Sequence, residues 1–256
     1  EGIGIPTWGL AGSAIIVDDL ILLNAGTRGM ALNKDTGKTV WKNGKGKAGY
    51  ASAVPYEKNG QKRAILFVGE ELVSVSLKDG KVIWTFPWKT NHDVNAADPI
   101  IKDDKIFISS GYSKGCALLE TDGTSVTEIW RSRDMRNHFN SCVLWNGYIY
   151  GFDESTLKCL EFNTGRQMWQ QRGLGKGSLM LADGKLIILS EDGRLVTART
   201  EPKDFKKISV ANVIGKKCWS VPVLANGRIY VRNSKGHLVC VDVKGKQNYK
   251  EKSNHA

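Results

Sequence analysis

Residues 31–42 read ALNKDTGKTVWK: a small residue and a leucine, a turn containing Asp, Thr and Gly, and a short run ending in Trp. Related stretches are SVSLKDGKVIW at 74–84 and CLEFNTGRQMW at 159–169, and a looser copy, ALLETDGTSVTEIW, ends at Trp130. The four tryptophans, at positions 41, 84, 130 and 169, are 43, 46 and 39 residues apart. A period near 40 residues indicates an array of supersecondary units.

Each copy is preceded by two more apolar runs joined by a polar turn. Examples are SAIIVDDLILLN from Ser13, SCVLWNGYIYGF from Ser141 and SVPVLANGRIYV from Ser220. Asn-Gly and Asp-Gly pairs between short apolar runs predict β-hairpins, so each unit holds four antiparallel strands. No run of 12 or more residues has the pattern of a capped helix. We therefore predict an all-β fold, a β-propeller of four-stranded antiparallel blades.

Six repeats are recognisable, and we assign them to one propeller domain over residues 1–256. Their approximate limits are 8–42, 50–85, 96–131, 139–170, 176–210 and 218–245. The last repeat has no clear fourth strand after Val243. We expect that strand to come from residues 3–6 or from sequence upstream of the chain.

The motif A-x-N/D-x-x-T-G-x-x-x-W resembles the tryptophan-docking repeat of the pyrroloquinoline quinone (PQQ) propellers. The match is close in the first copy and partial in two others, at Ala31, Thr36, Gly37, Trp41, Gly80, Trp84, Thr164, Gly165 and Trp169. The resemblance implies that each Trp packs between neighbouring blades, and physical chemistry supports this. Gly permits the positive φ of the turn, and a large indole can fill the gap between two twisted sheets.

The similarity covers nearly the whole chain, and the segment from Pro6 through Val243 further resembles bacterial PQQ-like repeat proteins. Relatives usually carry seven or eight blades, so the resemblance implies either a fragment or a first blade too degenerate to recognise. It also implies an extracytoplasmic location, periplasmic or secreted. The chain begins with Glu1 and shows no signal-peptide pattern. No stretch approaches the roughly 20 apolar residues of a membrane helix, so we expect no transmembrane segment.

The composition is that of a soluble globular protein, with 41% apolar and 25% charged residues. The net charge of +11 raises nucleic acid as a partner. However, the lysines are scattered over turn-like segments and no recognition motif accompanies them, so we predict no nucleic-acid partner. Five cysteines without a C-x-x-C pair indicate neither a disulfide set nor a zinc site. Cys159 and Cys240 occupy the repeat position of Ala31, where we expect them to pack as small apolar residues.

A candidate site follows from blade topology. The loop that enters the first strand and the loop between the second and third strands lie at the same end of a blade, around one mouth of the central channel. Five of the six entering segments end in Ser and one ends in Asp98. We expect the hydroxyls to bind nearby backbone groups. A carboxylate there should be solvated, hydrogen-bonded or coordinating, because an isolated buried charge is costly.

Aromatic and polar side chains surround Asp98 on this rim, as a small-ligand site requires. The candidate binding residues are Trp8, Asn95, Asp98, Asn137, His138, Lys176 and Trp219. No H-x-H or H-E-x-x-H spacing is present, so we predict no metal ligand among the histidines. The segment GLGKGS at 173–178 lacks the pattern of a phosphate-binding loop.

Two functions remain open. The first is a binding or scaffold protein that holds an unknown small molecule or protein at the funnel rim, similar to the propeller lipoprotein of bacterial outer-membrane assembly. The chain lacks a recognisable lipoprotein start. The alternative is a PQQ-dependent quinoprotein dehydrogenase that oxidises an alcohol or sugar. In that case the resemblance implies PQQ and calcium in the funnel and Asp98 as the catalytic base.

The sequence departs from the quinoproteins in two respects. It has no adjacent Cys-Cys pair and no match to their Glu, Asn and Asp calcium ligands. Repeat similarity reports blade packing, whereas chemistry depends on the site. We therefore favour the binding or scaffold protein, expect no cofactor, and leave catalysis undecided.

Overall fold

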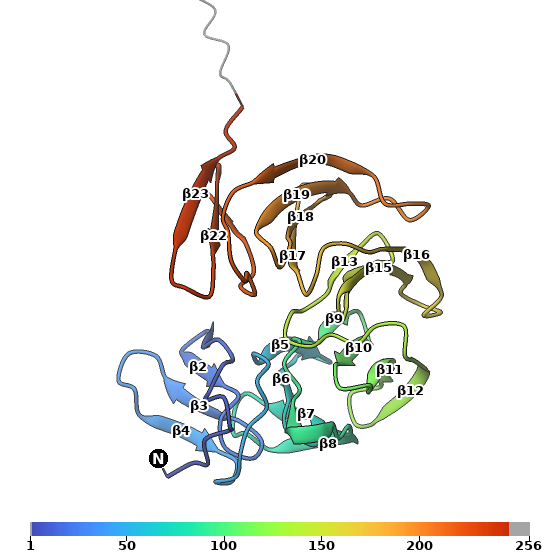
Figure 1. Cartoon of the computed structure of the whole chain (residues 1–256). Helices are drawn as coiled ribbons and strands as arrows, with labels where there is room; N and C mark the ends of the chain where they lie inside the picture. The colour runs from blue at the N-terminus through green and yellow to red at the C-terminus, as the bar shows by residue number, and fades with distance from the viewer. Residues whose placement is uncertain (1, 246–256) are drawn as a thin grey trace, which may run out of the picture.

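The computed structural model describes residues 2–245, which form six antiparallel sheets. Each sheet consists of strands consecutive in the sequence; five sheets have four strands and the last has three. Figure 1 shows the sheets following one another in an arc around a common centre. The predicted all-β propeller of four-stranded antiparallel blades is confirmed. Residue 1 and residues 246–256, which the predicted domain includes, lie outside the described part.

We number the sheets as blades 1 to 6 in chain order. Their strands are, for blade 1, β1 (Ile15–Val17), β2 (Leu20–Leu23), β3 (Met30–Asn33) and β4 (Thr39–Lys42); for blade 2, β5 (Val54–Lys58), β6 (Gln61–Phe67), β7 (Glu71–Ser76) and β8 (Val82–Pro87); for blade 3, β9 (Ile100–Lys102), β10 (Lys105–Ser110), β11 (Gly115–Thr121) and β12 (Val126–Ser132); for blade 4, β13 (Val143–Trp145), β14 (Tyr148–Asp153), β15 (Thr156–Glu161) and β16 (Gln167–Gln171); for blade 5, β17 (Ser178–Ala182), β18 (Lys185–Leu189), β19 (Arg194–Arg199) and β20 (Lys207–Asn212); and for blade 6, β21 (Val223–Ala225), β22 (Arg228–Arg232) and β23 (Leu238–Asp242).

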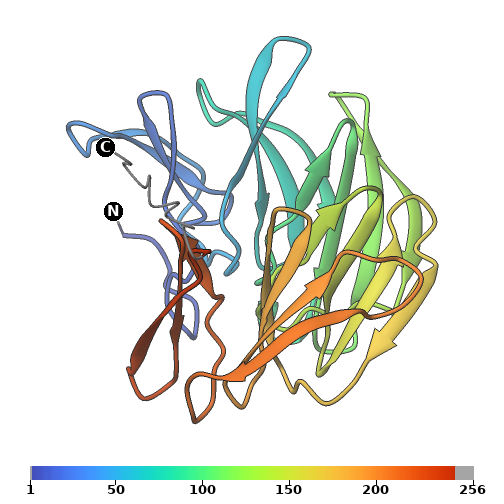
Figure 2. The same cartoon turned by 90° about the horizontal axis from the view of Figure 1, so that it is seen from above.

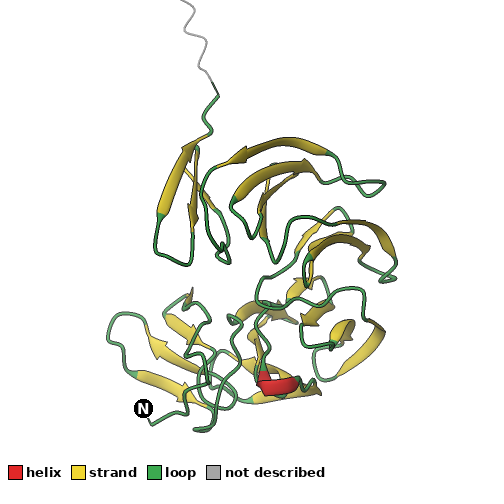
Figure 3. Ribbon diagram, in the orientation of Figure 1, coloured by secondary structure: helices red, strands yellow, loops and turns green. Residues whose placement is uncertain are grey.

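Helical structure within residues 2–245 is limited to one 3₁₀ turn, η1 (Asn91–Asp93), in the loop between blades 2 and 3. Figure 3 shows this turn in red. None of the described residues forms a helix with the length and apolar character needed to cross a bilayer. In Figure 2 the light-blue β5–β6 hairpin extends beyond its neighbours, consistent with the seven residues of β6.

The repeated tryptophans dock on the next blade. Trp41 pairs with the small residue Ala31 across β3 and β4, where the ladder carries a bulge, and its ring is 7% exposed. Its indole N–H donates to the Leu77 carbonyl of blade 2 at 2.9 Å. Trp130 donates in the same way to Phe162 of blade 4 at 3.1 Å. An indole therefore supplies both apolar contact area and one hydrogen bond to each of these junctions.

The turn glycine of the next blade provides the surface on which the indole lies. A Cβ at Gly80 would lie 2.6 Å from the Trp41 ring, and one at Gly165 would lie 2.8 Å from the Trp130 ring. Both glycines have positive φ. The Thr-Gly or Asp-Gly turn is therefore doubly constrained, by its own left-handed backbone and by the tryptophan of the preceding blade.

Trp84 is an exception among the docking tryptophans. Its indole nitrogen is buried and has no hydrogen-bond partner within the described residues. Blade 3 follows it, and the β11–β12 connection of that blade belongs to the looser repeat copy, in which Leu118 pairs with Trp130. The longer turn of this copy does not offer the acceptor that Leu77 and Phe162 offer at the other junctions.

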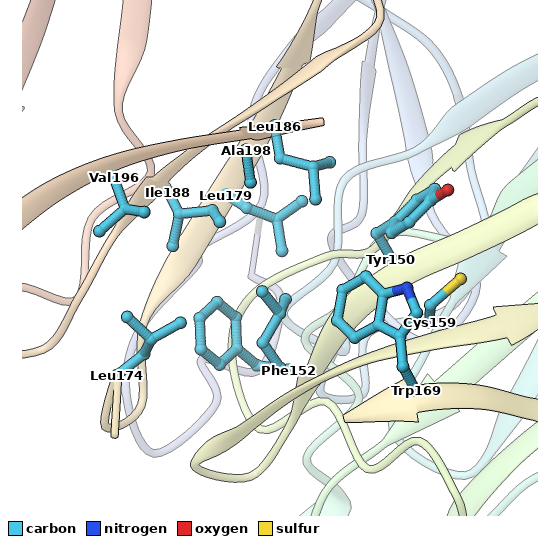
Figure 4. Packing of buried hydrophobic residues seen from close by; sticks show 11 residues of the cluster. Tyr150, Phe152, Cys159, Trp169, Leu174, Leu179, Leu186, Ile188, Val196 and Ala198 are labelled. Carbon is cyan, nitrogen blue, oxygen red and sulfur yellow. The ribbon is translucent and has the colours of Figure 1, made fainter. Parts of the chain in front are cut away.

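The core consists of apolar clusters between successive blades. In the cluster between blades 4 and 5, Tyr150 and Trp169 face Leu179, Leu186 and Ala198, as Figure 4 shows. The Trp169 indole donates to the Glu201 carbonyl at 2.7 Å. Burying an aromatic side chain of this size stabilises the fold by a few kcal/mol, about 3–5 kcal/mol when judged by truncation to alanine.

Blades 1 and 6, at the two ends of the arc, each expose a sheet face of the kind that a neighbouring blade covers in the other blades. In blade 1, Ile16 is 68% exposed, and in blade 6, Leu238 is 66% exposed. Cys240 is also exposed, whereas Cys159 at the same repeat position is buried, so the predicted packing role is found for Cys159 and not for Cys240. The reason is that this side of blade 6 has no further sheet packed over it within the described residues.

Residues 3–6 do not supply the fourth strand of blade 6, contrary to one of our two expectations. Gly4 instead forms an isolated parallel bridge with Lys47, in the loop that follows β4. Its N–H donates to the Lys45 carbonyl at 2.7 Å. The N-terminal segment is therefore held against blade 1.

The contact between a turn glycine and the indole of the preceding blade can be tested with two matched glycine variants. Gly80→Ala should lower the free energy of unfolding by about 1–3 kcal/mol more than Gly37→Ala, because only the first methyl group would collide with an indole. Both changes carry a similar cost, on the order of 1 kcal/mol, for a non-glycine residue at positive φ. Gly37 has φ +67 and nothing within 4 Å of its Cβ position. Urea unfolding of the two variants measures the difference, and equal losses would contradict the docking role of Gly80.

Candidate functional site

Loops from several blades enclose a cavity of about 530 Å³ at the end of the blades where the first strands begin, and we call this cavity the funnel. They are the segments that enter the first strands and the β10–β11 turn, as the blade topology predicts. The lining residues are Trp8, Ala11, Tyr50, Ser52, Val94, Ala96, Asp98, Tyr112, His138, Phe139, Ser141, Trp219 and Val221. Four of the seven predicted binding residues, Trp8, Asp98, His138 and Trp219, thus share one cavity.

Ring side chains dominate the funnel wall. Tyr112, His138, Phe139 and Trp219 form a continuous series, with centroid separations of 5.0, 5.3 and 4.5 Å between successive rings. Trp8 is tilted against Tyr50 at 5.7 Å. Trp8 is 59% exposed and Trp219 is 40% exposed, so both present large apolar surfaces to solvent. Such exposed rings in a concave setting are suited to hold a ligand or a side chain of a partner.

The residues that enter the first strands form a belt of hydrogen bonds between blades. The N–H of Ser13 donates to Ser52 Oγ at 3.1 Å, and the N–H of Ser52 donates to Asp98 Oδ1 at 2.6 Å. The N–H of Asp98 donates in turn to Ser141 Oγ at 2.9 Å. The expected backbone-binding role of the serines is found for Ser52, Ser141 and Ser178, the last of which donates to the Ser220 carbonyl at 2.9 Å. Asp98 fulfils the same role with a carboxylate. Of the three states expected for this residue, solvated, hydrogen-bonded or coordinating, the structure shows the hydrogen-bonded one.

The environment of Asp98 disfavours its charge. Burial in the funnel raises the pKa of Asp98, and hydrogen bonds from Ser52 and Ser141 oppose that rise only in part. Asp98 forms no ion pair among residues 2–245. Among the described residues the carboxylate is therefore compensated by hydrogen bonds alone, without a cationic partner.

His138 is held by a lysine from the next blade. Lys176 Nζ lies 3.1 Å from His138 Nδ1 and 3.2 Å from Glu154 Oε2. An ammonium group only donates hydrogen bonds, so Nδ1 of His138 is the acceptor and the ring proton lies on Nε2. Burial, followed by the charge of Lys176, lowers the pKa of His138. The imidazole is thus neutral near pH 7.

Trp219 is held from two sides. Its indole N–H donates to Glu191 Oε1 at 3.0 Å, and Lys217 Nζ lies 4.3 Å from its ring centroid. The other oxygen of Glu191 accepts from the N–H of Lys176 at 2.9 Å. That bond is the main cause of the lowered pKa of Glu191. Trp219 is therefore a positioned ring in spite of its exposure.

Three predicted residues lie outside the funnel lining: Lys176, which contacts His138, and two asparagines that belong to the framework of the loops. Asn95 is fully buried, and its amide donates to the carbonyls of Val68 and Trp88 at 2.7 and 3.2 Å. Asn137 is also buried and donates to the Phe152 carbonyl at 3.1 Å. Neither lines the funnel. These amides satisfy backbone groups in the loops and so shape the cavity from behind.

Three ring residues of the wall, Tyr50, Tyr112 and Phe139, were not among the seven predicted binding residues. Tyr112 lies in the β10–β11 turn, and Phe139 lies in the segment that enters β13. Both segments were expected at this end of the blades, so every aromatic residue in them was a candidate. Including every aromatic residue of the segments at this end of the blades would have identified all three.

A larger cavity, of about 800 Å³, lies between the hairpin turns of blades 1, 2 and 3. Its described lining contains four basic residues and two acidic ones, and some of these groups are engaged within the lining. Lys62 forms an ion pair with Asp18 at 2.6 Å, and Arg63 donates to Gln61 Oε1 at 2.8 Å. We place the candidate site in the funnel, where aromatic rings surround a carboxylate that has hydrogen bonds but no ion-pair partner among the described residues.

The funnel residues do not fit a quinone with its calcium ion. Among residues 2–245 no group of three or more His, Cys, Asp or Glu side chains is placed to hold a metal ion. Calcium takes six to eight oxygen ligands, usually with several carboxylates. The described part of the funnel lining offers one carboxylate, Asp98, and one of its oxygens is already engaged by Ser52. We derive no catalytic step through PQQ.

A family profile described as outer membrane protein assembly factor BamB matches residues 9–171 and, in a second match, residues 153–255. The chain belongs to this PQQ-like repeat family. The resemblance inferred from the tryptophan motif is thereby confirmed. No curated protein sequence matches the chain.

Solved structures of other propellers resemble the fold at low sequence identity. BamB from Moraxella catarrhalis is 14% identical with a TM-score of 0.63, covering 91% of this chain and 85% of that one. The quinohemoprotein alcohol dehydrogenase from Comamonas testosteroni is 12% identical with a TM-score of 0.63, covering 87% of this chain and 51% of that one. The computationally designed protein Ika8 is 8% identical with a TM-score of 0.68, covering 92% and 71%. These likenesses concern the fold alone.

The two roles of Asp98, hydrogen-bond acceptor and buried charge, can be separated by substitution. Asp98→Asn retains an acceptor for the Ser52 N–H and removes the charge, so at pH 7 it should be at least as stable as the wild type. Asp98→Ala should cost about 1–3 kcal/mol, because that N–H loses its acceptor.

The pH dependence of the same pair has a definite sign. Folding raises the pKa of Asp98, so the charged carboxylate lowers the free energy of unfolding. This destabilisation is complete at pH values above the pKa in the folded protein, and it disappears as the pH falls below the ordinary pKa of 3.8. The advantage of Asp98→Asn should therefore shrink between pH 7 and pH 4 in urea unfolding experiments. A constant difference across this range would contradict the buried charge.

The contact between Lys176 and His138 predicts a change in the pKa of His138 when the lysine is replaced. Lys176→Met should raise the pKa of His138 toward its ordinary value, because a neighbouring positive charge is removed, while burial keeps it from rising fully. Proton NMR titration of the imidazole measures this change. Lys217→Met is the control, since Lys217 contacts Trp219 and not His138. An unchanged pKa in Lys176→Met would refute the contact.

Proposed function

We propose that this chain is a PQQ-like propeller that acts as a binding or scaffold protein and holds a ligand, or a side chain of a partner protein, in the funnel. The observation that carries the proposal is the cavity of about 530 Å³, in which the described residues supply six ring side chains and one carboxylate. Binding sites generally combine an apolar concave surface with a few placed polar groups. Here the apolar surface comes from the rings and the polar groups are Asp98, Ser52 and Ser141.

The rings are positioned before any ligand arrives. Trp219 is fixed by Glu191 and Lys217, and His138 is fixed by Lys176. A wall that is already ordered loses little conformational entropy on binding, which favours affinity.

The family supports the same class of function. Its description, an outer membrane protein assembly factor, refers to a protein that works through protein partners, and the proposal extends such a role to this chain. An extracytoplasmic location is part of the proposal. The dehydrogenase alternative has a propeller of the same fold in the Comamonas enzyme, yet no observation on the funnel residues favours it.

Benzyl alcohol, a neutral aromatic probe, tests the funnel as a binding site. We expect saturation-transfer NMR to detect its binding, and Trp8→Ala and Trp219→Ala each to weaken that binding about three- to tenfold through lost ring contacts worth about 0.5–1.5 kcal/mol. Trp145→Ala is the matched control, because Trp145 is similarly exposed, at 36%, and does not line the funnel. Absence of binding, or an equal loss in Trp145→Ala, would refute the proposal.

A further inference from the structure

The charge of the funnel lining is opposite to that of the protein. The whole chain carries a net charge of +11. Among the described residues that line the funnel there is no Lys or Arg, and Asp98 is the one acidic residue. The cavity wall therefore carries a local negative charge in a basic protein. In a concave, apolar setting such a charge acts with little screening.

The lysines nearest the funnel are already engaged. Lys176 contacts Glu154 and His138, at 3.2 and 3.1 Å. Lys217 lies over the Trp219 ring, at 4.3 Å. Neither lines the cavity. The carboxylate of Asp98 is thus left to be compensated by something that enters the funnel.

The rings around this carboxylate have the chemistry that cations prefer. Trp and Tyr faces attract a positive charge within about 6 Å of the ring centre through their quadrupole, and the attraction increases when water is excluded. Trp8 and Tyr50 form one wall, and Tyr112, Phe139 and Trp219 form the other. Lys217 on the Trp219 ring shows that this protein already uses the contact.

The chemical groups of the lining favour one class of cation over others. A metal ion would need several oxygen ligands, and the described residues hold no such cluster. A bare ammonium group would require hydrogen-bond acceptors for three N–H groups on a wall that consists mostly of rings and small apolar residues. An alkylated ammonium has an apolar exterior and a diffuse charge, so it suits rings on the sides and a carboxylate at one point.

We propose that the funnel binds an alkylated organic cation, a quaternary or highly substituted ammonium group, with Asp98 as its counter-ion and the rings of Trp8, Tyr50 and Trp219 as its walls. The inference rests on the proposed binding function and names the ligand class for that site. A neutral ligand of the same size would fill the cavity and leave the carboxylate uncompensated.

Choline and 3,3-dimethyl-1-butanol form the probe pair for this proposal. They have the same shape, with nitrogen replaced by carbon, so charge is the difference between them. We expect choline to bind the wild-type protein at least fivefold more tightly than the neutral alcohol. In Asp98→Asn this ratio should fall close to one, through weaker choline binding.

The measurement is ligand-observed NMR at constant ionic strength, with sodium chloride replacing choline chloride, so that general screening is held fixed. Asp93→Asn is the matched control. Asp93 lies in η1 at the same end of the blades and is absent from the funnel lining, so its loss should leave the ratio at the wild-type value. Unfolding curves verify that both variants are folded.

The possible outcomes separate the two proposals. Equal binding of choline and the neutral alcohol to the wild type would overturn the cation inference and leave the binding function standing. A choline preference that persists in Asp98→Asn, or disappears equally in Asp93→Asn, would also overturn it. If neither probe binds and benzyl alcohol does not bind either, both proposals fail.

Discussion

The fold depends on the docking of an indole from one blade onto the turn of the next. Trp41 on Gly80 and Trp130 on Gly165 are the clearest cases, each with a hydrogen bond to a backbone carbonyl three residues before the glycine. A four-stranded sheet alone leaves its apolar faces exposed, so it is stable only when neighbours cover them. The indole fixes the separation and the angle between neighbours, and thereby the position of every loop at the ends.

The funnel is a consequence of that spacing. The loops that enter the first strands are brought side by side, and the belt from Ser13 through Ser52 and Asp98 to Ser141 ties them at the level of the backbone. Framework amides such as Asn95 tie the same loops from behind. Rings that belong to different blades can therefore form one wall, which no single blade could provide. Binding chemistry here is a property of the assembly of repeats.

Much of the fold could be predicted from the sequence, because the T-G-x-x-x-W spacing encodes a contact between blades and not merely a local turn. The site was partly predictable: blade topology places Trp8, Asp98, His138 and Trp219 at one end. It could not place Asn95 and Asn137, because polar residues in the same loops either face the cavity or satisfy buried carbonyls, and sequence alone does not distinguish these. The unpaired indole of Trp84 likewise depends on the turn of another blade.

The exposed faces at the two ends of the arc affect how the molecule holds together. A blade in the middle is secured by two junctions, whereas blade 1 and blade 6 are each secured by one within residues 2–245. Stability in such a linear array is close to a sum over neighbours, so loss of structure is cheapest at the margins and costliest at the centre. Amide protons in blades 3 and 4 should then exchange most slowly. The funnel wall includes residues from the loops that enter blades 1 and 6, so the funnel would lose its shape before the central blades unfold.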